Sequence, residues 1–130
     1  MKNMPIPEML VEHIDYLRSE GYEVDVIDDG EEIGIVFKNY PIPAHIYSSD
    51  KVDLLVITHP SYSNPKMDMF WVDPPVTLKK NGEDPKSTGT ATKFGKPWQQ
   101  FSWHIHTWNP AKDNLITYLD TINDRLRRNE

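Results

Sequence analysis

The densest group of reactive residues in this 130-residue chain lies in the stretch WQQFSWHIHTWNP, residues 98–110. Ser102 and His104 are two positions apart there, and His106 follows two positions later. Alternate residues of an extended strand share a face, so the imidazole of His104 can accept the hydroxyl proton of Ser102. A serine needs such a base because its free hydroxyl is a poor nucleophile near neutral pH. The spacing therefore indicates a serine nucleophile, Ser102, with His104 as its general base.

The two histidines of this stretch also permit a different chemistry. On one face of a strand, His104 and His106 would lie about 7 Å apart, which suits zinc if a third ligand comes from elsewhere. Other histidines, His45 and His59, or a carboxylate could supply that ligand, but none stands at a diagnostic spacing. We therefore expect no metal and no other cofactor, and a metal-dependent hydrolase that uses His104 and His106 remains an alternative.

The composition excludes several classes of protein. The chain has no cysteine, which rules out disulfides, thiolate metal sites and thiol catalysis. Its net charge of −6 does not suit nucleic-acid binding. No apolar run approaches the roughly 20 residues of a membrane span, and the N-terminus lacks the pattern of a signal peptide. We expect a cytoplasmic protein that binds neither nucleic acid nor membrane.

One amphipathic helix is predicted at each end of the chain. Residues 6–20 carry apolar side chains at helical spacing, and Gly21 ends the run. Residues 110–127 repeat the pattern, with Asn109 as the N-cap and Pro110 at the first helical position. The basic residues near the end of this second helix suit the negative pole of its dipole: Arg125, Arg127 and Arg128.

Extended runs fill the first half of the chain between these helices. Asp29-Gly30 joins the first two runs and is a strong hairpin signal. Residues 79–97 are polar with three Gly and two Pro, so we expect a long irregular segment that leads to the site. The pattern predicts an α+β fold with a four-stranded antiparallel meander over residues 22–28, 31–40, 51–60 and 67–74.

Three tryptophans surround the serine, and their spacing of five residues does not follow one strand face. Large aromatic side chains mostly serve burial, so we expect at least two of them to pack between the sheet and the last helix. A peptide-binding aromatic shelf is the alternative. The three residues are Trp98, Trp103 and Trp108.

The last third of the chain resembles ubiquitin-conjugating enzymes. Trp108 to Ala111 and the L-x-x-x-L-x-x-I helix after them are similar to the Trp-Ser-Pro-Ala segment that follows the active site in that family. The string Trp-Gln-x-x-Ser-x-His resembles in particular the prokaryotic family E of ubiquitin-conjugating-like proteins. Upstream, several residues stand in the order of the family's meander turn and aromatic strand: His59, Pro60, Pro65, Phe70 and Pro74.

This resemblance implies both a fold and a function. It implies one ubiquitin-conjugating-like α+β domain over residues 1–130, with an N-terminal helix, a four-stranded meander, an irregular active-site segment and a C-terminal helix. It also implies a bacterial conjugation pathway of the kind used in antiphage defence. The partners would be a ubiquitin-like modifier protein, a ubiquitin-activating-like enzyme and a target protein with a lysine.

The chain departs from that family at the nucleophile, because the family uses a cysteine and this chain has none. The His-Pro-Asn signature of the family is also absent upstream of the site. One interpretation is a transferase that carries the modifier as an oxyester on Ser102, with His104 as base. In it, the groups that contact the substrate or donate to the oxyanion would be His106, Gln100 and Asn109. The other interpretation is a catalytically inactive module that binds a ubiquitin-like protein or the activating enzyme.

Overall fold

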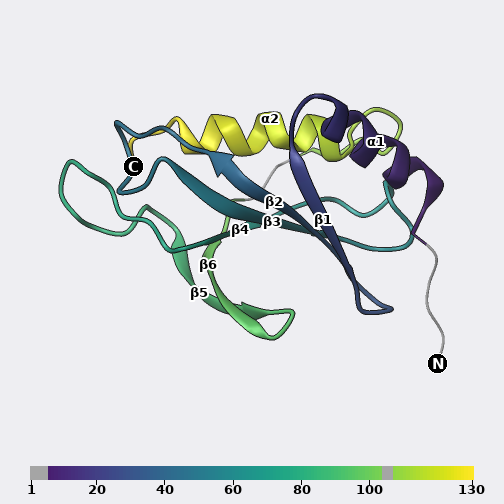
Figure 1. Ribbon diagram of the computed structural model, residues 1–130, viewed down its shortest axis with the longest axis horizontal. Helices are drawn as coiled ribbons and strands as arrows, with labels where there is room; N and C mark the ends of the chain where they lie inside the picture. The colour runs from purple at the N-terminus through teal and green to yellow at the C-terminus, as the bar shows by residue number, and fades with distance from the viewer. Residues whose placement is uncertain (1–5, 104–106) are drawn as a thin grey trace.

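The computed structural model describes residues 6–103 and 107–130, and it shows an antiparallel sheet with two helices on one of its faces (Figure 1). Helix α1 spans Glu8–Ser19 and helix α2 spans Leu115–Leu126. The predicted α+β class, with a helix at each end, is confirmed. The strands of this part of the chain are β1 (Glu23–Asp28), β2 (Ile33–Pro41), β3 (Lys51–Thr58), β4 (Phe70–Asp73), β5 (Thr88–Lys93) and β6 (Lys96–Phe101).

The first four strands form the predicted meander, because each pairs antiparallel with the next in the order β1-β2-β3-β4. The turn between β1 and β2 contains the expected Asp-Gly pair. The carboxylate of Asp29 accepts the backbone N–H groups of Glu31 and Glu32 at 3.1 and 2.7 Å. Gly30 has a φ of 95°, in the left-handed region that glycine adopts at little cost. The residues of the turn therefore determine its conformation without help from the rest of the chain.

The prediction of one long irregular segment over residues 79–97 was wrong, because part of this segment is a hairpin. Strands β5 and β6 form a further hairpin, and β6 pairs with β4, so the sheet has the order β1-β2-β3-β4-β6-β5. The β-branched side chains of Thr88, Thr90 and Thr92 alternate along β5, which favours a strand. Phe94 and Gly95 form a two-residue turn with φ of 49° and 78°, the signs that a tight hairpin requires.

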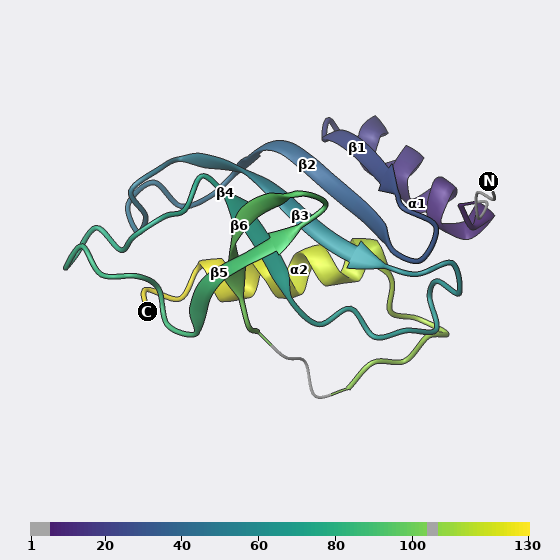
Figure 2. The same ribbon diagram turned by 90° about the horizontal axis from the view of Figure 1, so that it is seen from below.

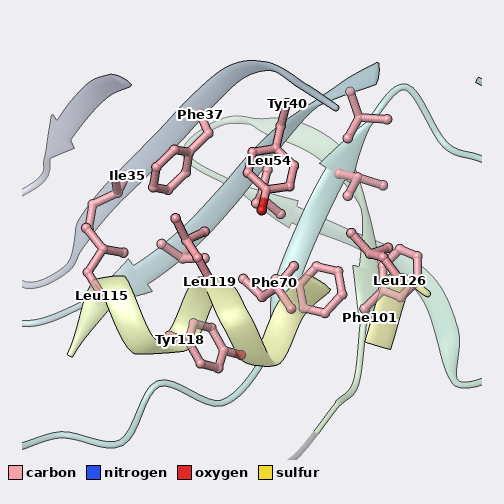
Figure 3. Close-up of a cluster of buried hydrophobic side chains, with 14 of the residues drawn as sticks. Ile35, Phe37, Tyr40, Leu54, Phe70, Phe101, Leu115, Tyr118, Leu119 and Leu126 are labelled. Atoms are coloured by element: carbon pink, nitrogen blue, oxygen red, sulfur yellow. The ribbon is translucent and has the colours of Figure 1, made fainter. Parts of the chain in front are cut away.

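The main core lies between the sheet and α2 (Figure 3). Apolar residues recur in α2 at intervals of three and four, so they form one stripe that faces the sheet. The strands contribute side chains from their alternate positions. Among the buried residues are Ile35, Phe37, Leu54, Phe70 and Phe101 from the sheet and Leu115, Tyr118, Leu119, Ile122 and Leu126 from the helix.

A smaller apolar cluster covers the opposite face, which we call the open face of the sheet. Its buried members are Val36, Leu55, Trp71 and Trp98. The ring of Phe94, at the turn of the β5–β6 hairpin, reaches back to Gly34 on β2, where a Cβ would lie only 2.6 Å from it. The hairpin is therefore curled over the open face (Figure 2, where α2 lies behind the sheet).

The tryptophans divide between the two faces. Trp103 and Trp108 pack against the main core, as expected, and the ring of Trp108 lies 6.5 Å from that of Tyr118 on α2. Trp98 instead packs on the open face and donates its indole N–H to the carbonyl of Lys93 at 3.2 Å. Trp98 therefore does not join the sheet to the last helix.

The start of α2 differs from the prediction, because the helix begins at Leu115 and not at Pro110. Asn109 and Asp113 close a separate turn, in which the Asn109 backbone N–H donates to the Asp113 carboxylate at 2.8 Å. The N-cap is Asn114, whose side-chain oxygen accepts the N–H groups of Ile116 and Thr117 at 2.8 and 3.2 Å. The hydroxyl of Thr117 accepts the Asn114 N–H at 2.9 Å in return, which completes a capping box.

Replacing this cap should destabilise the protein. Asn114→Ala removes the acceptor for two helix N–H groups, so we expect the free energy of unfolding to fall by about 1 kcal/mol. Urea denaturation followed by circular dichroism measures the change. Asn129→Ala, at an exposed position after the helix, is the matched control and should leave the midpoint in place. Equal midpoints for the two variants would show that Asn114 does not cap the helix.

Candidate functional site

Ser102 directly follows β6, at the point where the β5–β6 pairing ends. Its backbone N–H donates to the carbonyl of Ser87 at 3.0 Å, which extends the pairing by one step beyond Thr88 and Phe101. The residue is half-buried. The sheet therefore holds the backbone of Ser102 while its side chain keeps access to solvent.

The side chain of Gln100 links Ser102 to the neighbouring strand β4. Trp71 lies directly opposite Gln100 in the register, and its indole N–H donates to the Gln100 side-chain oxygen at 3.0 Å. An indole nitrogen can only donate, so this bond fixes which end of the amide is the oxygen. The amide nitrogen of Gln100 therefore faces Ser102, and it donates to the hydroxyl oxygen at 3.3 Å.

This arrangement affects the chemistry of the Ser102 hydroxyl. Because the oxygen accepts a hydrogen bond from Gln100, its own proton remains available to a base. A donor aimed at an oxygen also stabilises negative charge that develops there. The Trp71–Gln100–Ser102 chain can thus assist both the loss of the hydroxyl proton and the departure of this oxygen as a leaving group.

Strand alternation separates Ser102 from its hydrophobic neighbours. Gln100 and Ser102 lie on the open face, together with Trp71 and Trp98. Phe101 and Trp103, the residues on either side of Ser102, pack instead into the main core beneath α2. The Ser102 hydroxyl therefore lies on the open face, while the rings of the two flanking residues pack on the other face.

Arg125 supports this backbone from the helix side. It is 1% exposed, and its guanidinium carbon lies 5.4 Å from the ring centre of Phe101 and 5.5 Å from that of Trp103. One guanidinium nitrogen donates to the carbonyls of Lys86 and Glu130 at 2.9 and 3.1 Å. Arg125 thus contacts both residues that flank Ser102 and the segment that leads into β5.

The predicted site residues are only partly brought together. Gln100 contacts Ser102, whereas His104 and His106 lie outside the described residues. Asn109 uses its side-chain oxygen to accept the N–H of Ala111 at 2.9 Å. It adjoins Trp108, which packs beside Tyr118 near the start of α2, while Trp103 contacts Arg125 and Arg128 at the other end of the helix. Asn109 and Ser102 therefore belong to opposite ends of α2.

A hydrogen-bond cluster around Tyr62 fixes the chain just before α2. The Leu115 N–H donates to the Tyr62 hydroxyl at 2.5 Å, and this hydroxyl lies 2.8 Å from Nδ1 of His13 on α1. The next residue, Ser63, accepts the indole N–H of Trp108 at 2.8 Å and donates its hydroxyl proton to the Pro110 carbonyl at 3.0 Å. Helix α1 is thereby tied to the start of α2.

His13 is the titratable group of this cluster. The Tyr62 hydroxyl accepts from Leu115, and a neutral His13 can accept the hydroxyl proton of Tyr62 at Nδ1. Burial lowers the pKa of His13, and Glu12 opposes this shift. Burial also raises the pKa of Tyr62 to about 12, so its hydroxyl stays protonated. The folded state therefore favours the neutral imidazole.

This cluster makes stability depend on pH. The ordinary pKa of histidine is about 6.5, and the pKa of His13 is lower in the folded protein. At pH values below about 6.5, the unfolded chain therefore binds more protons than the folded protein does. The contribution of His13 to the free energy of unfolding should be complete above a pH of about 6.5. It should decrease as the pH falls below that value. The urea midpoint of the wild type should therefore fall as the pH is lowered below about 6.5. His13→Gln, which keeps an acceptor that does not titrate, should reduce the slope, whereas His59→Gln, at an exposed position, should retain it.

Two negative findings apply to the described residues alone. In residues 6–103 and 107–130, no three histidine or carboxylate side chains are grouped closely enough to hold a metal ion. Within the same ranges, neither 12-residue helix has the length and apolar character needed to cross a membrane. The alternative of a metal-dependent hydrolase concerned His104 and His106, which these ranges exclude, so it stays an untested alternative.

Sequence reasoning missed two supports of the site, Trp71 and Arg125. We predicted that Arg125 would join a basic group at the helix end, but it is buried. A signal for this was present, because Arg125 stands three residues after Ile122 and so continues the apolar stripe of α2. No such signal exists for Trp71, since its contact with Gln100 depends on the pairing of β4 with β6.

An N-terminal helix, an antiparallel sheet and a C-terminal helix in this order agree with the ubiquitin-conjugating-like architecture that the sequence resemblance implied. The sequence pattern of prokaryotic E2 family E matches residues 9–129. The chain therefore belongs to prokaryotic E2 family E, and the resemblance is confirmed. No curated protein and no solved structure matches it. As a cysteine-free member, this chain must use another nucleophile if it forms a covalent intermediate.

Proposed function

We propose that this protein is a transferase for a ubiquitin-like modifier and that it carries the modifier as an oxyester on Ser102. Membership of prokaryotic E2 family E supports a role in conjugation in general. The observation that carries the choice of residue is the hydrogen bond from Gln100 to the Ser102 hydroxyl oxygen, at 3.3 Å. The partners would be the modifier, an activating-type enzyme and a target protein that offers a lysine.

In the loading step, the Ser102 oxygen attacks the C-terminal carbonyl carbon of the activated modifier. A new C–O bond forms as the bond between that carbon and the activating enzyme's sulfur, or an adenylate oxygen, breaks. We assign the hydroxyl proton to His104, two residues further along the sequence, as general base. The Gln100 N–H assists because it stabilises negative charge on the attacking oxygen.

In the transfer step, the amine of the target lysine attacks the same carbonyl carbon. The bond to the Ser102 oxygen breaks as the amide forms, and His104 takes the proton that the amine loses and returns a proton to this oxygen. An alkoxide is a poor leaving group compared with a thiolate, so help at this oxygen matters more for a serine than for a cysteine. The Gln100 N–H points at the leaving atom, where such help is most effective.

A binding module without catalysis is the alternative that the lack of cysteine favours. Such a module would hold the modifier or the activating enzyme without forming a bond to it. The two functions differ in one measurable property, which is the formation of a covalent adduct.

The test mixes the protein with a ubiquitin-like protein, its activating enzyme and ATP, followed by intact-mass measurement. We expect an adduct that survives reductant, is cleaved by mild alkali and is absent from Ser102→Ala. Ser102→Cys is the matched control, because its adduct would be a thioester that reductant removes. His104→Ala should form the ester more slowly. An adduct on Ser102→Ala would contradict the proposal, and measurable affinity with no adduct on the wild type would favour the binding module.

A further inference from the structure

Gly89, in the interior of β5, has no structural reason to be a glycine. Its φ lies outside the left-handed range, and a Cβ built on it would meet nothing within 4 Å. A glycine inside a strand weakens the strand, and it commonly marks a place where a ligand or another backbone approaches closely. No other segment among the described residues makes that approach, so as far as residues 6–103 and 107–130 show, the space above Gly89 is free.

This free space adjoins the proposed nucleophile. Gly89 lies directly opposite Gln100 in the β5–β6 register, so both are on the open face. Ser102 is two residues beyond Gln100 on the same face, which makes it the diagonal neighbour of Gly89, at about 7–8 Å. An extended chain that crosses Gly89 can therefore bring its end to the Ser102 hydroxyl.

The other approach across the open face is occupied. Trp71 lies directly opposite Gln100 on β4, and Trp98 lies two residues before Gln100 on β6; both indoles are buried. The ammonium group of Lys93 lies 5.3 Å from the ring centre of Trp71, and that of Lys96 lies 4.3 Å from the ring centre of Trp98. Side chains thus cover the open face over β4 and towards the β5–β6 turn, whereas a Cβ at Gly89 would meet nothing within 4 Å.

We infer that the extended C-terminal tail of the modifier crosses the open face of the sheet over Gly89 to reach Ser102. This inference rests on the proposed function, which requires a carbonyl carbon to reach the Ser102 oxygen. Gly89 is then a specificity-determining residue, because a side chain there would occupy the space of the tail. The space above Gly89 would admit a narrow, extended chain end and would exclude a folded one.

The test compares two valine substitutions on neighbouring exposed positions of β5. Gly89→Val adds its side chain on the open face, and Thr90→Val changes the opposite face, because Thr90 pairs with Gln99. Valine suits a strand, so both variants should melt at or above the wild-type temperature. We expect Gly89→Val to load the modifier about tenfold to a hundredfold more slowly, because the tail is displaced from Ser102. Thr90→Val should load at the wild-type rate.

A binding measurement separates this inference from the proposed function. The same ubiquitin-like protein is titrated into ¹⁵N-labelled Ser102→Ala, with and without Gly89→Val. In Ser102→Ala, we expect the Gly89 amide resonance to shift. In Ser102→Ala with Gly89→Val, we expect a lower affinity for the ubiquitin-like protein. If the wild type forms no ester, the proposed function fails, and this titration still decides the inference. Wild-type loading by Gly89→Val, or a titration that leaves Gly89 unshifted, would overturn the inference alone.

Discussion

Replacing Arg125 with alanine is expected to lower the free energy of unfolding by about 3 kcal/mol, because it removes a large buried side chain and leaves two carbonyls without their donor. Arg125 is 1% exposed, and one guanidinium nitrogen bonds to the carbonyls of Lys86 and Glu130. Its contacts with the rings of Phe101 and Trp103 are lost as well. Urea denaturation measures the change directly.

The matched control is Arg127→Ala, two positions further along. Arg127 is exposed and pairs with Asp124 one helical turn earlier, so its loss should change stability by less than about 0.5 kcal/mol. Arg125→Lys should fall between the two variants, because lysine keeps the charge but cannot donate in the fork geometry of a guanidinium. A cost below about 1 kcal/mol for Arg125→Ala would mean that neighbouring side chains refill the space.

The position of Arg125 also connects stability with the site. The two rings that it contacts belong to the residues on either side of Ser102. Through Lys86 it also holds the segment whose next residue, Ser87, accepts the N–H of Ser102. A conjugating protein with a serine nucleophile needs an accurately placed oxygen, since displacement by about 1 Å can cost a hundredfold in rate. Arg125 therefore supports the site although it lies on the other side of the backbone.

Local patterns predicted the parts of the fold that local sequence controls. The helices followed from apolar spacing, and the Asp29-Gly30 turn followed from its dipeptide. The β5–β6 hairpin was missed because two prolines and three glycines suggested a loop, although the alternating threonines of β5 and the Phe94-Gly95 turn were readable. The false N-cap at Asn109 arose because Asn109 and Asn114 both precede plausible helix starts, and only the second is followed by a capping threonine.

The site was less predictable than the fold. Ser102 was predicted as the nucleophile from its spacing to His104 and from the family resemblance. Its contact with Gln100 is local and follows from strand alternation. The part that the sequence could not reveal is the partner of Gln100, because Trp71 is distant in the chain and only the β4–β6 register places it opposite. The cross-strand pair with Trp71 thus determines which way the Gln100 amide points.

Gln100→Leu should slow the transfer of the modifier from Ser102 to a lysine by about a hundredfold, the usual cost of removing one donor from a developing negative charge. The substitution also leaves the Trp71 indole N–H without its acceptor, which should reduce stability by only about 1 kcal/mol. Trp71→Phe retains Gln100 but removes the bond that orients its amide, so we expect a smaller loss of rate. Single-turnover release of the preformed ester to free lysine measures this step apart from loading.

Repeating Gln100→Leu in the Ser102→Cys protein decides whether the amide acts on the leaving oxygen or only on the shape of the site. A thiolate leaves readily, since the pKa of an unperturbed thiol is about 8.5, and a sulfur atom accepts hydrogen bonds weakly. If Gln100 stabilises the departing oxygen, its loss should slow transfer much less from the thioester than from the ester, and the two substitutions should be strongly non-additive. An equal slowing in both proteins would mean that Gln100 only positions residue 102. It would also leave serine without the assistance that makes an ester a competent intermediate in this fold.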